Sequence, residues 1–478
     1  MSCFVIFHAW RRPCQKYSIR FEAIDKRLLI LTSDKFMKNI LIIGAGRSSA
    51  NLIKYLLEHA ALLDWHLRVG DMDVSFASAK IGDSTHGEAF QLDASNVTQR
   101  RSEIERSDLV ISMLPAFMHM EVAKDCIHFG KNVITPSYIP DEMWQLDGQA
   151  KEKGIVILNE MGVDPGIDHM SAMKIIDRLK SEGATLESFE SFTGGLIAPV
   201  SDNNPWHYKI TWNPRNVILA GYGGTARYRE NGGVKCIPYQ RLFERITTVD
   251  LGTDGQFEGY GNRDSLKYLS LYNLENIPTL YRGTLRKAGY CSAWNALVQL
   301  GLTDDSFQMS FSKNSNWETL TNSFLPEGQG AIEERLQAYL NVSDEIIEKL
   351  TWLGILEKNP IGLEKGSPAQ ALQHLIEKRW VLGADDKDMI VMWHRFRYHL
   401  NGQTKELQSK LVSYGDDPMH TAMSKTVGLP IAIAAKHILS GNWQLSGVQL
   451  PTNSSIYEPV LQELEELGIL FSETEYNL

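Results

Sequence analysis

One stretch of the sequence, NILIIGAGRSSANLIKYLL at residues 39–57, constrains the fold more strongly than any other. It joins an apolar run of strand length to a glycine turn and then to apolar residues at helical spacing. This order is typical of a buried parallel strand that leads into a helix. Gly44 permits the tight turn, and Gly46 lets the backbone approach a pyrophosphate at the helix N-terminus. The stretch predicts a dinucleotide site; a plain strand–helix turn without a ligand is the alternative.

Segments of strand and helix length alternate up to residue 160. Strands are expected at 65–71, 108–115, 132–137 and 155–160, and a helix at 119–130. This alternation implies right-handed crossovers and a doubly wound, Rossmann-like parallel sheet, so the expected fold class is α/β. Beyond residue 185, longer strands and loops predict an α+β substrate and dimerisation domain with a helical insertion.

The domain boundaries follow from these changes in pattern. Five parts are expected: an N-terminal extension (1–36), an NAD(P)-binding Rossmann domain (37–165), an α+β substrate domain (166–302 and 391–425), a helical domain (303–390), and a C-terminal segment that packs back on the Rossmann domain (426–478). Residues 389–400 and 405–414 are expected to form paired strands. The helical pattern of TAMSKTVGLPIAIAAKHILSG contains Pro430, which is expected to kink or divide that helix.

The N-terminal residues do not read as the start of such a domain. Their arginines follow a short apolar run, which is the opposite order to that of a secretory signal. Because MKNILIIGAG reads as a natural beginning, Met37 is expected to be the true start. Residues 1–36 are then a disordered or wrongly assigned extension.

Composition excludes some classes of partner. The 478 residues carry a formal net charge of -10, which argues against nucleic-acid and anionic-membrane partners because both favour a basic face. Five cysteines without a CxxC pair indicate reduced thiols in a cytoplasmic protein and give no support for a metal site. No apolar run approaches the roughly 20 residues that a membrane span needs.

Two acidic residues mark the end of the expected second strand. A carboxylate at Asp71 or Asp73 takes the adenosine ribose hydroxyls and disfavours a 2′-phosphate, so NAD(H) is the favoured cofactor. Arg47 in the glycine turn can neutralise a phosphate, which leaves NADP(H) open. A solvated strand end is the alternative interpretation of Asp71.

The stretch NEMGVDPGIDHM holds ionisable residues at a Pro-Gly turn. Asp164 lies at the carboxyl end of a strand, where open parallel sheets bind their ligands, so we expect it to face the substrate. Asp168 is expected to cap the helix that follows. His169 is interpreted equally well as a packing residue or as an acid–base group.

Other polar segments lie at strand ends or in loops. Ser137 and Tyr138 end a strand at the same expected cleft, and GNRDS places Asn262, Arg263 and Asp264 in a loop. Arg282 and Arg286 follow in YRGTLR; several arginines in one domain favour a ligand with several carboxylates. For any single arginine, a surface ion pair is the alternative.

These segments resemble those of a known family. NEMGVDPGIDHMSA, SFTGGLIAPVSDNNPWHYKITW, GYGNRDS, YRGTLR and AMSKTVGLPIAIAAKHILSG are similar, in order from about residue 38 onward, to the glutamate-forming saccharopine dehydrogenases. The resemblance implies a homodimeric oxidoreductase of lysine metabolism. Such an enzyme interconverts saccharopine with L-glutamate and L-2-aminoadipate 6-semialdehyde by hydride transfer to or from an imine carbon.

The resemblance also implies site residues. Cofactor contacts fall on Gly44, Ala45, Gly46, Arg47, Ser48, Asp71, Met72, Asp73, Asp93, Ser137, Tyr138, Val163 and Pro165. Substrate contacts fall on Tyr138, Ile139, Asp164, Asn262, Arg263, Asp264 and, across a stretch whose spacing differs, Arg241. Asp164 is the catalytic candidate, since a carboxylate near an iminium stabilises it and can move its proton. Relatives that use NADP carry a basic residue where this chain has Asp71 and Asp73, which agrees with NAD(H).

Two other functions stay open at this point. A carboxynorspermidine-type polyamine reductase would take a diamine in place of glutamate, and it would need an acidic pocket where this chain has arginines. A dinucleotide-binding regulator without turnover would need only the glycine turn.

Overall fold

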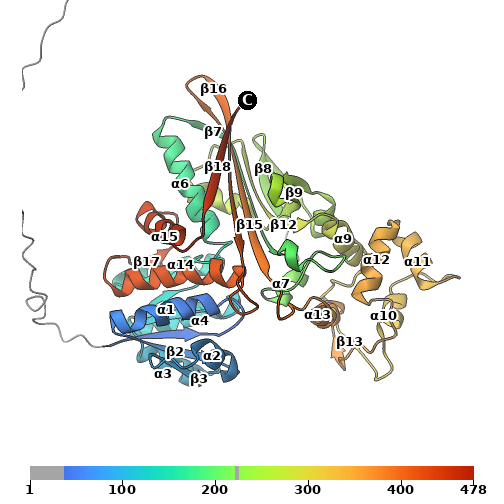
Figure 1. Cartoon of the computed structure of the whole chain (residues 1–478), viewed down its shortest axis with the longest axis horizontal. Helices are drawn as coiled ribbons and strands as arrows, with labels where there is room; N and C mark the ends of the chain where they lie inside the picture. Colours follow the sequence, from blue (N-terminus) through green and yellow to red (C-terminus); the bar gives the residue numbers. More distant parts are fainter. Residues whose placement is uncertain (1–36, 221–224) are drawn as a thin grey trace, which may run out of the picture. The chain divides into compact units, whose positions relative to one another are not determined.

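The structure is a computed structural model that describes residues 37–220 and 225–478. Its helices and strands form two sheets with their covering helices and one largely helical lobe (Figure 1). The expectations for residues 1–36 lie outside the described residues.

The first sheet has seven parallel strands in the order β17, β6, β5, β4, β1, β2, β3. These strands are β1 (Lys38–Ile43), β2 (Trp65–Asp71), β3 (Gly87–Gln91), β4 (Leu109–Ser112), β5 (Asn132–Ile134), β6 (Val156–Leu158) and β17 (Gly447–Gln449). The helices that connect them are α1 (Ala50–Leu63), α2 (Val74–Ile81), α3 (Val97–Glu105), α4 (His119–Phe129) and α5 (Asp147–Glu152). The doubly wound α/β fold class is confirmed.

Burial on both faces explains why β1 is a continuous apolar run. Ile40 and Ile42 belong to the core on one face of the sheet, and Leu41 and Ile43 to the core on the other. At the end of β1, Gly44 has φ +100°, and a Cβ there would lie 3.1 Å from the Met113 carbonyl oxygen. The turn therefore needs glycine for its conformation and for its close approach to the end of β4.

The second sheet is mixed and contains nine strands. Its path is β10, β11, β12, β7, β15, β16, β18, with β8 and β9 joined through β12; only the β12–β7 pair is parallel. The strands are β7 (Thr185–Ile197), β8 (Ala226–Glu230), β9 (Gly233–Ile237), β10 (Thr247–Asp250), β11 (Gln256–Gly261), β12 (Thr279–Lys287), β15 (Asp388–Leu400), β16 (Gln403–Tyr414) and β18 (Phe471–Asn477). The expected pairing of the strands at 389–400 and 405–414 is confirmed.

Helices cover both sheets and build the lobe between β12 and β15. They are α6 (Ile167–Ser181), α7 (Pro214–Ile218), α8 (Tyr268–Leu271), α9 (Tyr290–Leu300), α10 (Trp317–Ser323), α11 (Ile332–Leu340), α12 (Asp344–Leu353), α13 (Pro368–Arg379), α14 (Ala422–Leu439) and α15 (Ser454–Glu466). The lobe also holds a two-stranded sheet of β13 (Met309–Ser310) and β14 (Lys365–Gly366). Short 3-10 helices are η1 (Ala116–Met118), η2 (Asp141–Leu146), η3 (Pro199–Ser201), η4 (Tyr239–Glu244), η5 (Gly252–Asp254) and η6 (Ser265–Lys267).

Of the two effects expected of Pro430, division of the helix is wrong, because α14 runs through Pro430 without a break, and a kink stays a prediction. The helix is buried on both sides of the proline and packs closely on α1; a Cβ on Gly428 would lie 2.7 Å from the Leu52 backbone nitrogen. Tertiary packing thus outweighs the backbone hydrogen bond that proline removes.

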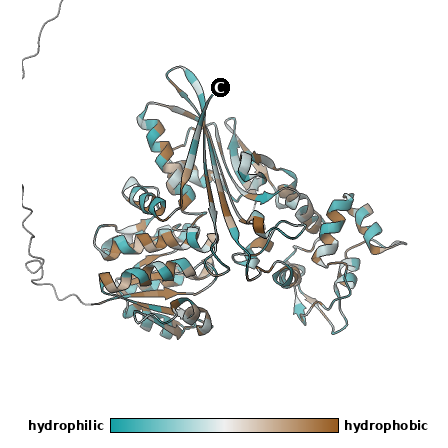
Figure 2. Cartoon of the chain, in the orientation of Figure 1, coloured by the Kyte–Doolittle hydropathy of each residue, from teal (hydrophilic) through white to brown (hydrophobic). Residues whose placement is uncertain are grey.

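One core connects the two sheets. The apolar cluster on the Ile42 face of the parallel sheet continues through Ile433 of α14 to Met392 and Phe396 on the near face of the mixed sheet. Figure 2 shows apolar residues along the strands and on one side of the covering helices. Trp393 and Tyr281 lie in a separate cluster on the far face of the mixed sheet.

The chain that follows α14 contributes a strand to each sheet. β17 extends the parallel sheet beside β6, and β18 pairs with β16 at the edge of the mixed sheet (Figure 1). The segment between 447 and 477 therefore contacts the nucleotide domain and the substrate domain in turn.

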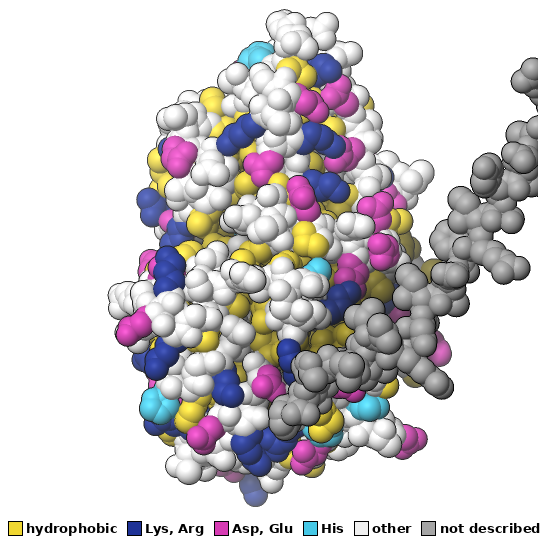
Figure 3. Space-filling model, turned by 90° about the vertical axis from the view of Figure 1, so that its left-hand side faces the viewer, with side chains coloured by type: hydrophobic (Ala, Val, Ile, Leu, Met, Phe, Trp, Pro, Cys, Tyr) yellow, Lys and Arg dark blue, Asp and Glu magenta, His cyan; other side chains and the backbone are white. Residues whose placement is uncertain are grey.

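The surface does not show one dominant charge on the face in Figure 3, where acidic and basic side chains are interspersed around exposed apolar atoms. Within residues 37–220 and 225–478, no helix combines the length and the apolar character that crossing a membrane requires.

Candidate functional site

The glycine turn is held by the two strand ends beside it. The Ala45 N–H donates to Asp71 Oδ2 at 2.6 Å, and the Asp73 N–H donates to Asp71 Oδ1 at 3.0 Å. Lys80 on α2 donates from Nζ to the Ala45 carbonyl oxygen at 2.6 Å. Both oxygens of Asp71 thus brace the backbone, and a lysine stands beside that carboxylate. Sequence reasoning missed Lys80, because a basic residue within a short helix carries no motif.

Other predicted cofactor contacts lie around this turn. Arg47 donates from Nη1 to the Ile210 carbonyl oxygen at 3.2 Å, so the turn reaches the substrate domain. A Cβ on Gly46 would meet no atom within 4 Å, which leaves the outer side of the turn open. Asp73 and Asp93 each accept hydrogen bonds from the backbone and hydroxyl of a serine two residues on, and these bonds lower the pKa of both carboxyls.

A buried histidine lies behind the predicted contact Ser137. His119, the first residue of α4, has Ser112 Oγ at 2.9 Å from Nδ1, and Ser137 Oγ and Thr135 Oγ1 at 2.8 and 3.0 Å from Nε2. Burial lowers the pKa of His119 to about 4, so the ring is neutral near pH 7. His119 therefore holds the loop after β5, which continues into Tyr138. The sequence signals only the start of a helix at this position.

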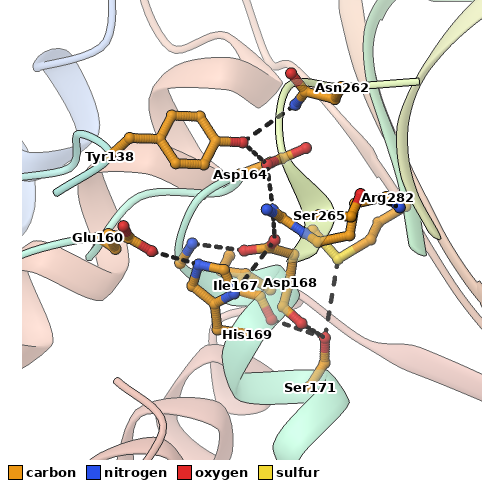
Figure 4. Close-up of polar contacts among 12 residues, drawn as sticks. Tyr138, Glu160, Asp164, Ile167, Asp168, His169, Ser171, Asn262, Ser265 and Arg282 are labelled. Atoms are coloured by element: carbon orange, nitrogen blue, oxygen red, sulfur yellow. Dashed lines mark hydrogen bonds and ion pairs between the residues drawn. The ribbon is translucent and has the colours of Figure 1, made fainter. Parts of the chain in front are cut away.

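Residues from strand β12 and from the loops after β5 and β11 converge on Asp164 (Figure 4). The Tyr138 hydroxyl donates to Asp164 Oδ1 at 2.5 Å, and Asn262 Nδ2 donates to the Tyr138 hydroxyl at 3.1 Å. Arg282 donates from Nη2 to Asp164 Oδ1 at 2.9 Å, and Arg263 lies over the Tyr138 ring with Cζ 5.1 Å from its centre. The structure thus brings together Tyr138, Asp164, Asn262 and Arg263, which sequence reasoning placed in the site, and adds Arg282 as the link between two carboxylates. We call these residues, with Asp168, the Asp164 cluster.

The expected cap by Asp168 is wrong. Gly166 is the N-cap of α6, and no side chain caps it. Asp168 Oδ1 accepts the Gly166 N–H at 2.6 Å, and Oδ2 accepts from Arg282. The N–H groups of Ile167, Asp168 and His169 already donate to the carbonyl oxygens of Gly162, Val163 and Gly166, so the Asp168 side chain is left to pair with the buried Arg282 guanidinium.

His169 is a buried residue that is hydrogen bonded to two other buried side chains. It is fully buried, with Nε2 2.7 Å from Glu160 Oε2 and Nδ1 2.6 Å from the Tyr272 hydroxyl. Glu160 was missed by sequence reasoning; its other oxygen accepts the Ile139 N–H at 2.9 Å. This explains the position of Ile139, a predicted substrate contact, because the buried Glu160 fixes the backbone beside Tyr138.

The two clustered carboxyls have opposite pKa shifts. Burial, and then the negative charge of Asp168, raise the pKa of Asp164. Burial also acts to raise the pKa of Asp168, but its interactions with His169 and Arg282 and the Gly166 N–H outweigh burial and leave its pKa below the ordinary value. Asp168 is therefore the fixed anion that pairs with Arg282, and Asp164 is the carboxyl that is poised to exchange a proton.

The lowered pKa of Asp168 predicts acid-sensitive stability. A carboxyl with a depressed folded pKa stabilises the fold fully above its unfolded value, near 3.8, and this contribution is lost as pH falls through the folded value. Urea unfolding between about pH 5 and pH 2 should therefore show a steeper loss of unfolding free energy in the wild type than in Asp168→Asn. Equal slopes would contradict the assignment of the shift to Asp168.

Some predicted residues lie apart from the Asp164 cluster. Arg241 on η4 is exposed and pairs with Glu244, with Nη1 2.7 Å from Oε2. Asp264 caps η6 and pairs with Arg227 at 3.0 Å. Arg286 is buried within a cage of three tyrosine rings: Tyr208, Tyr260 and Tyr290. Val163 and Pro165 flank Asp164 in the turn, Met72 is exposed, and Ser48 lies partly exposed at the glycine turn.

Comparison with protein families gives two matches along the chain. The model described as "Saccharopine dehydrogenase NADP binding domain" matches residues 40–158, and the model described as "Saccharopine dehydrogenase C-terminal domain" matches residues 162–469.

Curated relatives and a solved structure agree with these matches. Alpha-aminoadipic semialdehyde synthase, mitochondrial, of Rattus norvegicus is 34% identical over 96% of this chain and 50% of its own length. Saccharopine dehydrogenase [NADP(+), L-glutamate-forming] of Schizosaccharomyces pombe is 30% identical over 91% of this chain and 99% of its own length. The apo saccharopine dehydrogenase (L-Glu forming) from Saccharomyces cerevisiae superposes with a TM-score of 0.83 at 30% identity, covering 92% of this chain and 100% of that one.

The chain spans about half the length of the aminoadipic semialdehyde synthases that it matches, and about the whole length of the yeast dehydrogenases. The matched nucleotide-domain model and the yeast relatives are named for NADP, so the expected preference for NAD(H) is not supported. That expectation counted Asp71 as free to meet the ribose, whereas both its oxygens brace the glycine turn. On these matches, the chain belongs to the saccharopine dehydrogenase family.

Proposed function

We propose that this chain interconverts saccharopine with L-glutamate and L-2-aminoadipate 6-semialdehyde, and that it acts on the C–N bond through an imine. The observation that carries the proposal is the Asp164 cluster: a proton-exchanging carboxyl, a buried tyrosine and an arginine at the carboxyl edge of the parallel sheet. The family matches support it. A bound nicotinamide would supply or accept the hydride.

In this proposal Asp164 exchanges a proton with the substrate nitrogen and stabilises its positive charge. Reduction of an imine needs a protonated nitrogen, and a carboxylate beside the resulting iminium stabilises its charge. The Tyr138 hydroxyl and Arg282 hold Asp164 Oδ1, so the carboxyl has a fixed orientation. Oδ2 of Asp164 is then the oxygen that exchanges the proton.

Arg263 is the proposed partner of a substrate carboxylate. It is exposed above the Tyr138 ring, and the described residues place no carboxylate within ion-pair distance of it. Arg282, by contrast, already pairs with Asp164 and Asp168. A guanidinium that is free in the cluster favours a dicarboxylic amino acid such as glutamate over a diamine. This observation weighs against the polyamine reductase.

The test is direct. Purified protein is incubated with saccharopine and each oxidised cofactor, while reduced-nicotinamide absorbance and glutamate release are followed together. Equal production of reduced nicotinamide and glutamate is expected. In the reverse direction, glutamate should support cofactor oxidation with the semialdehyde, and a diamine should not. Nucleotide binding without turnover of saccharopine would favour a regulator.

We further propose NADP(H) as the cofactor. Lys80, beside Asp71 and the Ala45 carbonyl, is the residue we assign to the 2′-phosphate, and the names of the relatives support this choice. Lys80→Ala should lower kcat/KM with NADPH about tenfold and leave kcat/KM with NADH close to the wild-type value, since a charged hydrogen bond is lost only in the first case. Lys54→Ala on the exposed side of α1 is the control. An equal loss with both cofactors would contradict the assignment.

A homodimer and a cytoplasmic location also stay proposals. The homodimer rests on the family resemblance, and the cytoplasmic location rests on the scattered cysteines. Light scattering of the eluted protein gives the oligomeric state, and fractionation of source cells gives the location. A monomeric mass, or recovery with organelles, would contradict them.

A further inference from the structure

The mixed sheet has a cavity on the face that points away from the Asp164 cluster. It has a volume of about 330 Å³. Its floor is formed by side chains that are at most 9% exposed, namely Glu190 of β7, Tyr228 of β8 and Tyr281 of β12. Arg245 and Glu230 stand at its rim. Volumes of this size are typical of sites for small molecules.

The cavity lies directly behind the Asp164 cluster across a single sheet. Tyr281, Glu190 and Arg395 pair side by side on β12, β7 and β15, and all face the cavity. The next residue on β12 is Arg282, which faces the cluster, because neighbouring strand residues point to opposite faces. A ligand on Tyr281 would therefore touch the strand that carries Arg282.

In the inner part of the cavity, the charges of Arg395 and Glu190 neutralise each other, but the guanidinium of Arg395 is not fully hydrogen bonded. Arg395 donates from Nη2 to both oxygens of Glu190, at 2.6 and 2.7 Å. Its Nε is buried, and it has no hydrogen-bond partner among the described residues. A buried N–H without a partner is costly, so this atom points to an acceptor supplied from elsewhere.

Three charged residues line the rim: Arg245, Glu230 and Glu244, of which Glu244 is paired with Arg241. Arg245 donates from Nη2 to the Tyr228 hydroxyl at 3.2 Å, and within the described ranges it has no ion pair. Among the residues that the structure describes, Glu230 has one ion pair, with Lys235, whose Nζ lies 3.9 Å from Oε2. Between them, the Tyr228 and Tyr281 rings lie 4.2 Å apart at 33° and give an apolar surface.

We propose that this cavity binds a free α-amino acid as a zwitterion. Its carboxylate pairs with Arg245, its ammonium pairs with Glu230, and its side chain lies on the Tyr228–Tyr281 rings. An acceptor on that side chain, or a water that it orders, reaches Arg395 Nε. A ligand with a single charge would engage either Arg245 or Glu230 and leave the other without a partner from the ligand. This site goes beyond the proposed function and uses none of the residues assigned to it.

The test is calorimetric titration of the full chain, without cofactor, using L-leucine, L-glutamine and L-lysine as probes. Butyrate and butylamine are the single-charge probes. The variants are Arg245→Gln and Glu230→Gln. The matched control is Arg397→Gln, two residues beyond Arg395 on the same strand, where the arginine pairs with Glu406 at 2.9 Å outside the cavity. Asp164→Asn reports on binding at the Asp164 cluster. Circular dichroism checks that each variant is folded.

At least one amino acid is expected to bind the wild type, Arg397→Gln and Asp164→Asn with equal affinity. Its affinity should fall about tenfold or more in both rim variants, as expected for the loss of a charged hydrogen bond. Three results would overturn the proposal: no binding up to about 10 mM, loss of binding in Asp164→Asn but not in the rim variants, or equal binding of butyrate or butylamine. Since no turnover is measured, the result is independent of whether the protein oxidises saccharopine.

Discussion

Asp164→Asn is expected to lower kcat by about two orders of magnitude or more, in the range typical of a lost general acid–base group. The amide keeps the size of the carboxyl, but it carries no charge to stabilise an iminium and cannot exchange the proton. Burial and Asp168 raise the pKa of Asp164, which prepares the carboxyl for this exchange. Steady-state saccharopine oxidation measures the effect, and a fluorescence titration with the reduced cofactor should give an unchanged Kd.

The control for this variant is Asp141→Asn, because Asp141 is exposed and pairs with Lys267 at the surface. Its rates should match those of the wild type. If Asp164→Asn turned over at the wild-type rate, Asp164 could not be the proton-exchanging group, and the proposed role would be rejected.

Arg282→Gln is expected to give the largest change in stability, a loss of about 3–5 kcal/mol of unfolding free energy. Arg282 is 3% exposed and pairs with Asp164 and Asp168. Without the guanidinium, two buried carboxyls of like charge face each other. Urea denaturation monitored by tryptophan fluorescence measures the loss.

The pH dependence separates this mechanism from loss of packing. Without Arg282 the folded pKa of the carboxyl pair rises, so the unfolded chain releases protons before the folded one as pH increases. The destabilisation should therefore be small near pH 4 and grow as pH rises through the folded pKa. A loss that is constant with pH would indicate packing alone. Arg397→Gln is the control, since that arginine is half exposed and its ion pair contributes little.

Local sequence predicted β1, β2, β4, β5 and β6, because most of their residues are buried. It did not predict β3, whose residues are half-buried or exposed, or the short strand β17. β2 runs from Trp65 to Asp71 as expected, and the helix at 119–130 ends at Gly130 in a left-handed conformation. The mixed sheet was harder, because its order joins strands that are distant in the chain, such as β7 with β12 and β15. No local pattern gives the C-terminal pairing of β18.

Sequence analysis predicted the site residues that are polar side chains at strand ends or in loops. It missed the residues whose role depends on buried hydrogen bonds. Tyr138 and Asp164 were found because they follow strands at one edge of the parallel sheet, and Asn262 because it lies in a polar loop after β11. Glu160 and His119 were missed, because their importance comes from hydrogen bonds inside the protein. Asp168 was given a local role as a helix cap, whereas its main partner, Arg282, is distant in sequence. Contacts between residues so distant in sequence can be identified only in the folded structure.

Because β17 and β18 come late in the chain, neither sheet can be completed until this segment has been synthesised. One joins the parallel sheet beside β6 and the other joins the mixed sheet beside β16. Until residues 447–477 have left the ribosome, β6 and β16 lack their native partners and can pair with a foreign strand. A chain released by a ribosome that stalls before Gly447 would leave β6 and β16 unpaired on that side, which makes it a target for chaperones and for degradation.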